Sequence, residues 1–139
     1  MTYPRFPKRM DGSNKYGNKS SLCAAGHSHR SMLESSVCAI LHMRLKSKEF
    51  VLIEAEVRIP VCGKPGHSCK HNEIIYSIVD FKCTKPDGGI VWVESKGFET
   101  SDWRLKRRLW VHNDVGMLEI WQGSSARPLL HETIIPRSA

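Results

Sequence analysis

The sequence predicts an α/β fold with an α+β-like order of elements: a helix, three strands, a second helix and a fourth strand around a mixed central sheet. Three observations support this prediction. Residues 32–46 have apolar side chains at helical spacing, residues 49–60, 74–83 and 90–96 have strand-like patterns, and residues 101–112 are amphipathic. The chain has 139 residues, 40% of them hydrophobic, so one domain with an ordinary core is expected.

The first 28 residues are predicted to form a basic, flexible arm. Their helix-breaking residues are Pro4, Pro7, Gly12 and Gly17, and no apolar period is present. Residues 1–30 carry six basic side chains and one acidic side chain, and the whole chain has a net charge of +7. Because such an arm neutralises phosphates, a polyanionic partner is favoured over a small neutral substrate. Residues 29–139 are expected to form the single folded domain.

The first helix is predicted at residues 32–46. Its apolar positions are Leu33, Val37, Ile40, Leu41 and Leu45, and Ser31 with Glu34 fits the S-x-x-E capping box. The next segment alternates apolar and charged residues, which indicates a strand with one solvent-exposed face. This strand is predicted to end at Pro60. A Gly/Pro/Cys/His hairpin loop at 62–72 then leads to a more buried strand at 74–83.

The second half of the domain is predicted from a turn and a capped helix. K-P-D-G-G at 85–89 is a turn signal, and β-branched and aromatic residues follow it at 90–96. Thr100 or Ser101 begins a helix that runs to about His112, with Trp103 and Trp110 on its apolar side. A short strand at 117–121 completes the sheet, and an irregular tail is expected at 122–139.

Asp80, Glu94 and Lys96 are the strongest candidates for chemistry, because each stands where a half-buried strand would carry an apolar residue. Side chains alternate along a strand, so Glu94 and Lys96 share a face. A hairpin loop of three residues would place Asp80 opposite one of them, whereas a two-residue loop would change the parity. Glu34 lies beside the apolar stripe of the first helix. Converging carboxylates are costly to bury without a cation, and Mg²⁺ prefers oxygen ligands.

Ordinary structural roles compete with this interpretation. Glu34 can be the third residue of a capping box and nothing more. Asp80 can begin a turn, and Glu94 with Lys96 can form a surface ion pair of small energy. The catalytic interpretation is favoured because these four positions occur together and in order, and because the residues around them resemble those of a known family, described next.

The flanking residues resemble a known nuclease family. Asp80-Phe81 is followed, after a hairpin, by V-E-S-K-G at 93–97, and the match extends to K-Y-G-N-K at 15–19, S-x-x-E at 31–34 and the block 93–110. These segments resemble a small family of phage and prophage endonuclease-like proteins of the PD-(D/E)XK superfamily. The order Glu, Asp, Glu-x-Lys is similar to the phage endonuclease I group, which resolves Holliday junctions. The resemblance covers roughly residues 14–121, is most specific at 93–110, and departs at Val79, where the superfamily name has proline.

This resemblance implies a restriction-endonuclease-like core and a set of roles. Asp80 and Glu94 would bind Mg²⁺ or Mn²⁺, with Glu34 as an auxiliary ligand. Lys96 would orient or deprotonate the attacking water. Lys106 matches a basic position that would approach a substrate phosphate.

Basic residues on the arm and on the second helix are candidates for DNA binding. They are Lys15, Lys19, Arg104, Lys106, Arg107 and Arg108. A solvated helix face is the competing explanation, but the position of the helix directly after Glu94-x-Lys96 favours phosphate binding. The four tryptophans are expected to be packing residues.

Cysteine and histidine residues form two further patterns. Cys62, His67, Cys69 and His71 fall in one loop and are the residue types that bind zinc, although the spacing C-x4-H-x-C-x-H is not that of a familiar zinc finger. Cys23, His27 and His29 form another candidate half-site. The competing explanation is a polar hairpin loop with reduced thiols, which the odd count of five cysteines also allows.

Three functions are therefore compared. The first is a metal-dependent endonuclease of phage or prophage type that acts on branched or structured DNA, for which a homodimer would suit the symmetry of a four-way junction. The second is a non-enzymatic, basic nucleic-acid-binding protein, with or without a zinc ion. The third is a nuclease fold used as an inhibitor or assembly factor. No apolar segment is typical of a membrane span or signal peptide, so a cytoplasmic location, in the host cell if the protein is phage-encoded, is expected.

Overall fold

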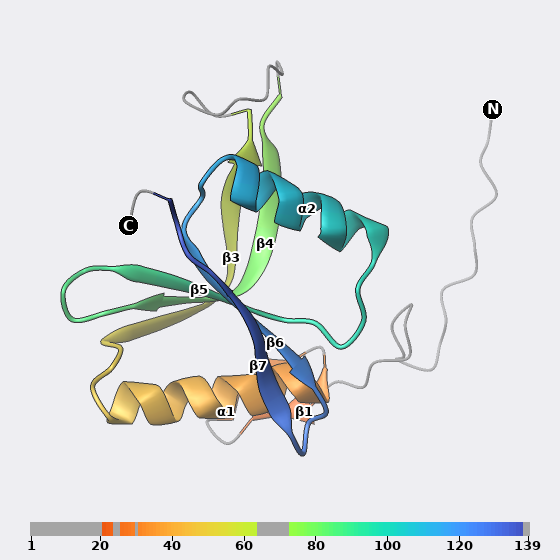
Figure 1. The fold of residues 1–139 in the computed structure, drawn as a ribbon. Helices are drawn as coiled ribbons and strands as arrows, with labels where there is room; N and C mark the ends of the chain where they lie inside the picture. Colours follow the sequence, from red (N-terminus) through yellow and green to blue (C-terminus); the bar gives the residue numbers. More distant parts are fainter. Residues whose placement is uncertain (1–20, 24–25, 30, 64–72, 138–139) are drawn as a thin grey trace, which may run out of the picture.

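The computed structural model describes residues 21–23, 26–29, 31–63 and 73–137. Its elements (Figure 1) are, in chain order, β1 (Ser21–Leu22), β2 (Ser28–His29), α1 (Met32–Lys46), β3 (Leu52–Cys62), β4 (Ile75–Thr84), β5 (Ile90–Ser95), α2 (Ser101–His112), β6 (Met117–Gly123) and β7 (Pro128–Ile134). The predicted order of two helices and four main strands is confirmed. Neither helix in this part of the chain is long and apolar enough to cross a membrane.

Both helices begin where the sequence predicts. The Ser31 hydroxyl accepts a hydrogen bond from the Glu34 N–H at 3.1 Å, and the Thr100 hydroxyl accepts one from the Trp103 N–H at 3.2 Å. These caps satisfy N–H groups that have no partner within a helix. Basic residues in the last turn of α1, Arg44 and Lys46, interact favourably with the helix dipole.

The sheet is mixed, as predicted, with strand order β3-β4-β5-β6-β7. β5 and β6 are parallel and are connected by α2, and the other neighbours are antiparallel. A parallel pair requires a crossover connection, which α2 supplies. The molecule is therefore an α+β domain with a five-stranded mixed sheet and two helices.

Two apolar cores pack against this sheet. One surrounds α1 and includes Phe81 and Val93, and the other surrounds α2 and includes Val79 and Trp92. Val79 and Phe81 stand at alternate positions of β4 and yet belong to different cores, so the β3–β4 ribbon passes from one core to the other at Asp80. Figure 1 shows the two ends of this ribbon beside different helices.

β3 corrects the prediction that its strand ends at Pro60. The strand continues to Cys62, with a register shift between Pro60 and Cys62. β3 is an edge strand, where the missing N–H of proline removes no ladder hydrogen bond.

Two segments expected to be irregular are partly ordered. Within the predicted arm, β1 and β2 form an antiparallel pair, with the Cys23 N–H donating to the His27 carbonyl at 2.9 Å. The remainder of that arm, residues 1–20, lies outside the described residues. Within the predicted tail, β6 continues to Gly123 and β7 pairs with its open edge, where Ile134 packs against the α2 core.

Candidate active site

Asp80 and Glu94 lie at the point where β4 and β5 separate, which we call the β4–β5 fork. The last paired residues are Phe81 and Val93, so Asp80 and Glu94 are the next opposite positions in register. Beyond them the ladder is replaced by side chains: the Asp80 N–H donates to Glu94 Oε2 at 3.1 Å. The Ser95 N–H and hydroxyl both donate to Asp80 Oδ2, at 2.9 and 2.8 Å. The loop at 85–89 contains an odd number of residues. An odd number keeps Asp80 directly opposite Glu94, as the prediction from the sequence requires.

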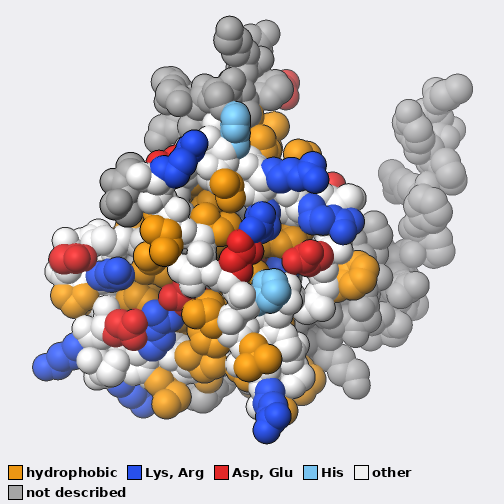
Figure 2. Space-filling view, in the orientation of Figure 1, with side chains coloured by type: hydrophobic (Ala, Val, Ile, Leu, Met, Phe, Trp, Pro, Cys, Tyr) orange, Lys and Arg blue, Asp and Glu red, His pale blue; other side chains and the backbone are white. Residues whose placement is uncertain are grey.

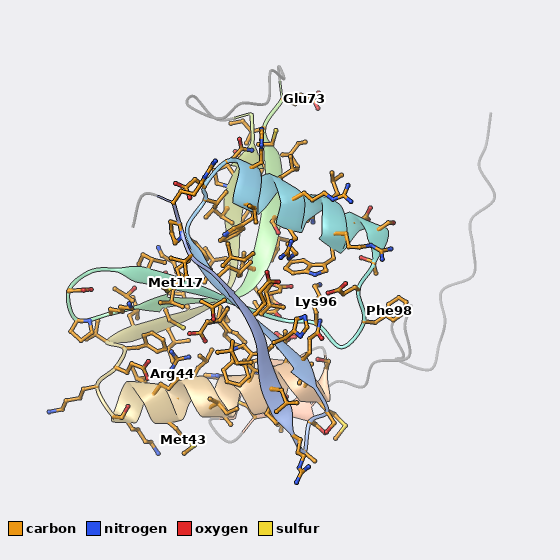
Figure 3. All side chains as sticks on the ribbon, in the orientation of Figure 1. Met43, Arg44, Glu73, Lys96, Phe98 and Met117 are labelled. Carbon is orange, nitrogen blue, oxygen red and sulfur yellow. The ribbon has the colours of Figure 1, made fainter. Side chains whose placement is uncertain are left out.

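Lys96 completes this arrangement from the end of β5. Its Nζ lies 3.2 Å from Glu94 Oε1 and 5.1 Å from the centre of the Trp103 ring on α2. The Lys96 N–H donates to the Trp121 carbonyl at 2.8 Å, which fixes the backbone against β6. In Figure 3, Lys96 lies between α2 and the β6–β7 strands. The Lys96 side chain is 29% exposed, so it is partly accessible beside the buried carboxylate of Glu94.

Glu34 joins the site from the first turn of α1 and is only 6% exposed. Its backbone N–H forms the predicted cap with Ser31. Its carboxylate Oε1 lies 3.3 Å from His29 Nδ1. Burial, followed by the nearby charge of Asp80, raises the pKa of Glu34, so Glu34 is close enough to Asp80 for the two charges to interact.

Glu56 is a fourth member that the sequence did not identify. It lies opposite Asp80 on β3, between the pairs Ala55–Phe81 and Val57–Val79, and its φ of +52° is unusual for a residue other than glycine. Its charge contributes to the raised pKa values of both Asp80 and Glu34. The alternation of apolar and charged residues in β3 places both Glu54 and Glu56 on the solvent-exposed face of the strand. The sequence therefore contains no local signal that distinguishes Glu56 from Glu54.

We refer to Glu34, Glu56, Asp80 and Glu94 as the carboxylate cluster. Burial, and then the charge of Asp80, raises the pKa of Glu94 to about 8. Burial also raises the pKa of Asp80, although the hydrogen bonds from Ser95 oppose this shift. In this cluster, burial and the charges of neighbouring carboxylates both disfavour the ionised form of Glu34, Asp80 and Glu94.

Glu119 on β6 provides a structural contrast. It is also buried, at 7% exposure, but Arg44 donates to both of its carboxylate oxygens at 2.7 and 3.0 Å. Arg44 also pairs with Glu49. The charge of Glu119 is thus compensated by Arg44, whereas the charges within the carboxylate cluster repel one another.

A group of cysteine and histidine residues lies beside Glu34. One potential ligand atom from each of Cys23, His27, His29 and Cys38 is within 4.8 Å of every other, so this Cys/His cluster could hold a metal ion. The spacing of the first three residues indicated a half-site, but Cys38 looked like part of the apolar stripe of α1. Sequence reasoning therefore missed the residue that connects the hairpin to the helix.

The other predicted zinc group is not assembled among the described residues. Cys62 is fully buried at the end of β3 and is disulfide-bonded, and a disulfide sulfur is not a thiolate ligand. His67, Cys69 and His71 lie outside the described residues.

The predicted basic residues of α2 divide into two kinds. Arg104 and Arg108 are exposed, whereas Arg107 is only partly exposed and pairs with Glu132 on β7. Lys106 is partly exposed, and Lys15 and Lys19 lie outside the described residues. Figure 2 shows Lys and Arg side chains gathered over α2, next to Asp and Glu side chains.

An open pocket of about 490 Å³ adjoins this basic surface and is separate from the carboxylate cluster. Its lining residues are Arg107, Arg108, Leu109, Val111, His112 and Arg137. Positive charge therefore continues along the C-terminal half of α2.

Comparison of the chain with protein-family models, with curated proteins and with solved structures found no match.

Proposed function

We propose that this protein is a metal-dependent endonuclease that hydrolyses phosphodiester bonds of DNA. The observation that carries the proposal is the convergence of Asp80, Glu94 and Lys96 at the β4–β5 fork, near enough to Glu34 and Glu56 for the charges of these carboxylates to interact with that of Asp80. The resemblance of the 93–110 block to PD-(D/E)XK nucleases, including the restriction-endonuclease-like core that it implies, supports the same activity.

The proposed ion is Mg²⁺ or Mn²⁺, because carboxylate oxygens are the ligands that these hard cations prefer. Asp80 and Glu94 would hold the ion, and Glu34 would serve as an auxiliary ligand. When bound, a divalent cation stabilises the negative charge that develops on phosphate oxygens during hydrolysis. Glu94 and Asp80 would hold such an ion in their ionised forms, which burial and then their mutual charge disfavour at present.

Lys96 orients the attacking water in this proposal. Its ammonium is fixed by Glu94 Oε1 at 3.2 Å and by the face of Trp103, so its position is set before a substrate binds. Ser95 holds Asp80 through two hydrogen bonds and thereby keeps its carboxylate in register with Glu94. These residues position reacting groups and need no large rearrangement.

The basic surface of α2 would bind the DNA backbone. Arg104 and Arg108 are exposed on α2, whose first turn carries the Trp103 ring that contacts Lys96. Phosphate contacts of this kind orient a substrate without reading its sequence. Branched DNA is the substrate class to examine first, with a homodimer as the expected form on a four-way junction.

The test uses the full chain with a four-way junction, a nicked duplex and a linear duplex, each with Mg²⁺, Mn²⁺ or a chelator. We expect metal-dependent cleavage that falls about 100- to 1,000-fold in Glu94→Gln and in Lys96→Gln, because both remove charge from the reacting centre. DNA affinity and folding should be largely retained.

Lys82→Gln provides a matched control. Lys82 also sits on a central strand, 3.7 Å from Glu54 and 5.8 Å from the Trp92 ring, with 31% exposure. Its substitution should leave cleavage unchanged. Equal activity in Lys96→Gln and wild type would contradict the catalytic role, and salt-sensitive binding without cleavage would favour the non-enzymatic, nucleic-acid-binding alternative.

A further inference from the structure

The Cys/His cluster lies where the β1–β2 hairpin packs against α1, with Cys23 in the same core as Val37 and Leu41. β1 and β2 are paired through only two residue pairs, and Cys23, His27 and His29 come from this small hairpin. Cys38 comes from α1. A hairpin of this size does not stabilise itself in water, so a connection to α1 determines whether it stays ordered.

The donor atoms are already directed at a common point. The His27 N–H donates to Cys23 Sγ at 3.3 Å, and Cys38 Sγ lies 3.7 Å from His27 Nδ1. His29 is 6% exposed, and its Nε2 is buried with no hydrogen-bond partner in the structure. A buried imidazole nitrogen without a partner is costly, and a metal ion at the centre of the cluster would satisfy it.

We propose that Cys23, His27, His29 and Cys38 bind a structural zinc ion. Two thiolates and two imidazoles in a closed set are the donors of a tetrahedral structural zinc site. Cys23 and Cys38 are buried and are not disulfide-bonded, which suits them to a site without an open coordination position. The zinc ion would fasten the β1–β2 hairpin to α1.

His29 extends this site towards the carboxylate cluster. Its Nδ1 lies 3.3 Å from Glu34 Oε1, so that Nε2 can bind zinc while the Nδ1 hydrogen is donated to the carboxylate. A carboxylate that receives this hydrogen bond orients a zinc-bound histidine. The zinc site would thus fix the direction of Glu34, a consequence that rests on the proposed function, whereas zinc binding itself does not.

The test measures zinc in the full chain purified under reducing conditions, without any assay of cleavage. We expect about one zinc ion per chain, and a cobalt-substituted protein with tetrahedral ligand-field bands and a thiolate charge-transfer band. Cys38→Ala and His27→Ala should lose the metal. His27 is exposed, so its substitution leaves the core intact and separates lost binding from failed folding. Cys83→Ala and His131→Ala are the matched controls and should retain zinc.

Glu34 supplies a second, graded measurement. Glu34→Ala should weaken zinc affinity by about 10- to 100-fold in a chelator competition, because the second-shell hydrogen bond is lost. Glu54→Ala, also a glutamate but outside the cluster, should not change it. Zinc retained in both Cys38→Ala and His27→Ala, zinc lost only in Cys69→Ser, or a Cys23–Cys38 disulfide in the untreated protein would each overturn the proposal.

Discussion

Glu56 shows how one residue can carry both strain and function. Its positive φ places an L-residue in the left-handed region, which costs about 1–2 kcal/mol. The carboxylate also faces the charges of Asp80 and Glu34. Neither effect favours folding, so the conformation is retained at the expense of stability. Glu56 lies between Ala55 and Val57, opposite the β4–β5 fork, so the strained backbone occurs at the candidate site.

Substitution by glycine should therefore have opposite effects at neighbouring positions. Glu56→Gly relieves the left-handed strain and removes a repulsive charge, so it should raise the free energy of unfolding by about 1 kcal/mol. Glu54→Gly, at an ordinary strand position paired with Lys82, should lower it by a similar amount. Urea unfolding of both variants measures the difference. Destabilisation by Glu56→Gly would show that this backbone conformation is not strained.

The central residues of the site could be predicted because strand alternation and turn parity are local rules. These rules place Asp80 opposite Glu94 and put Lys96 on the same side. Glu56 could not be predicted, because its role depends on where β3 crosses between two cores. Cys38 was assigned to the apolar stripe, since a buried thiol and a small apolar residue give the same helical pattern.

At the scale of the element, α2 carries a paired arginine, Arg107, and two exposed arginines, Arg104 and Arg108, which the proposed function assigns to DNA binding. Arg107 pairs with Glu132 and so connects the helix to β7. Arg107→Ala should lower the free energy of unfolding by up to about 1 kcal/mol. Arg104→Ala and Arg108→Ala should instead weaken DNA binding and reduce its salt dependence by about one counterion per lost phosphate contact.

Fluorescence anisotropy at several salt concentrations, together with chemical unfolding of each variant, separates the two effects. An unchanged salt slope in Arg104→Ala would exclude this face of α2 from DNA binding. Unchanged stability in Arg107→Ala would show that its ion pair with Glu132 contributes nothing measurable.

The helices and strands that were predicted correctly are specified by sequence patterns within their own residues. α1 has a cap, an apolar period and basic C-terminal residues, and its predicted bounds of 32–46 are confirmed. β7 has no such pattern, because it is an edge strand with mostly exposed side chains that forms by pairing with β6. The β1–β2 hairpin likewise depends on residues of α1, and a basic composition alone suggested an arm.

For the whole molecule, the carboxylate cluster makes stability depend on pH. The pKa of Glu94 rises from an ordinary 4.5 to about 8 on folding, so the folded state binds more protons between these values. Stability is therefore greatest near and below pH 4.5, as far as this group is concerned, and falls as the pH rises through about 8. For one proton, the free energy of unfolding changes by at most about 1.4 kcal/mol per pH unit.

Unfolding measured across this pH range should show that decline, and Glu94→Gln should flatten it, because an amide stays neutral. Added Mg²⁺ should restore stability at the alkaline end in wild type and much less in the variant. Glu119→Gln, which breaks the contact with Arg44, should lower stability while leaving the slope intact. Parallel curves for wild type and Glu94→Gln would contradict the raised pKa.

The fork between β4 and β5 also provides two spectroscopic probes. The amide proton of Asp80 is bonded to the carboxylate of Glu94, and the amide proton of Ser95 is bonded to the carboxylate of Asp80. An amide proton shifts in an NMR spectrum when its acceptor gains or loses charge. Coupled carboxylates titrate as a unit in any bulk measurement, but here each has a backbone reporter of its own. Two cross-peaks are thus enough to follow the ionisation of the two carboxylates separately.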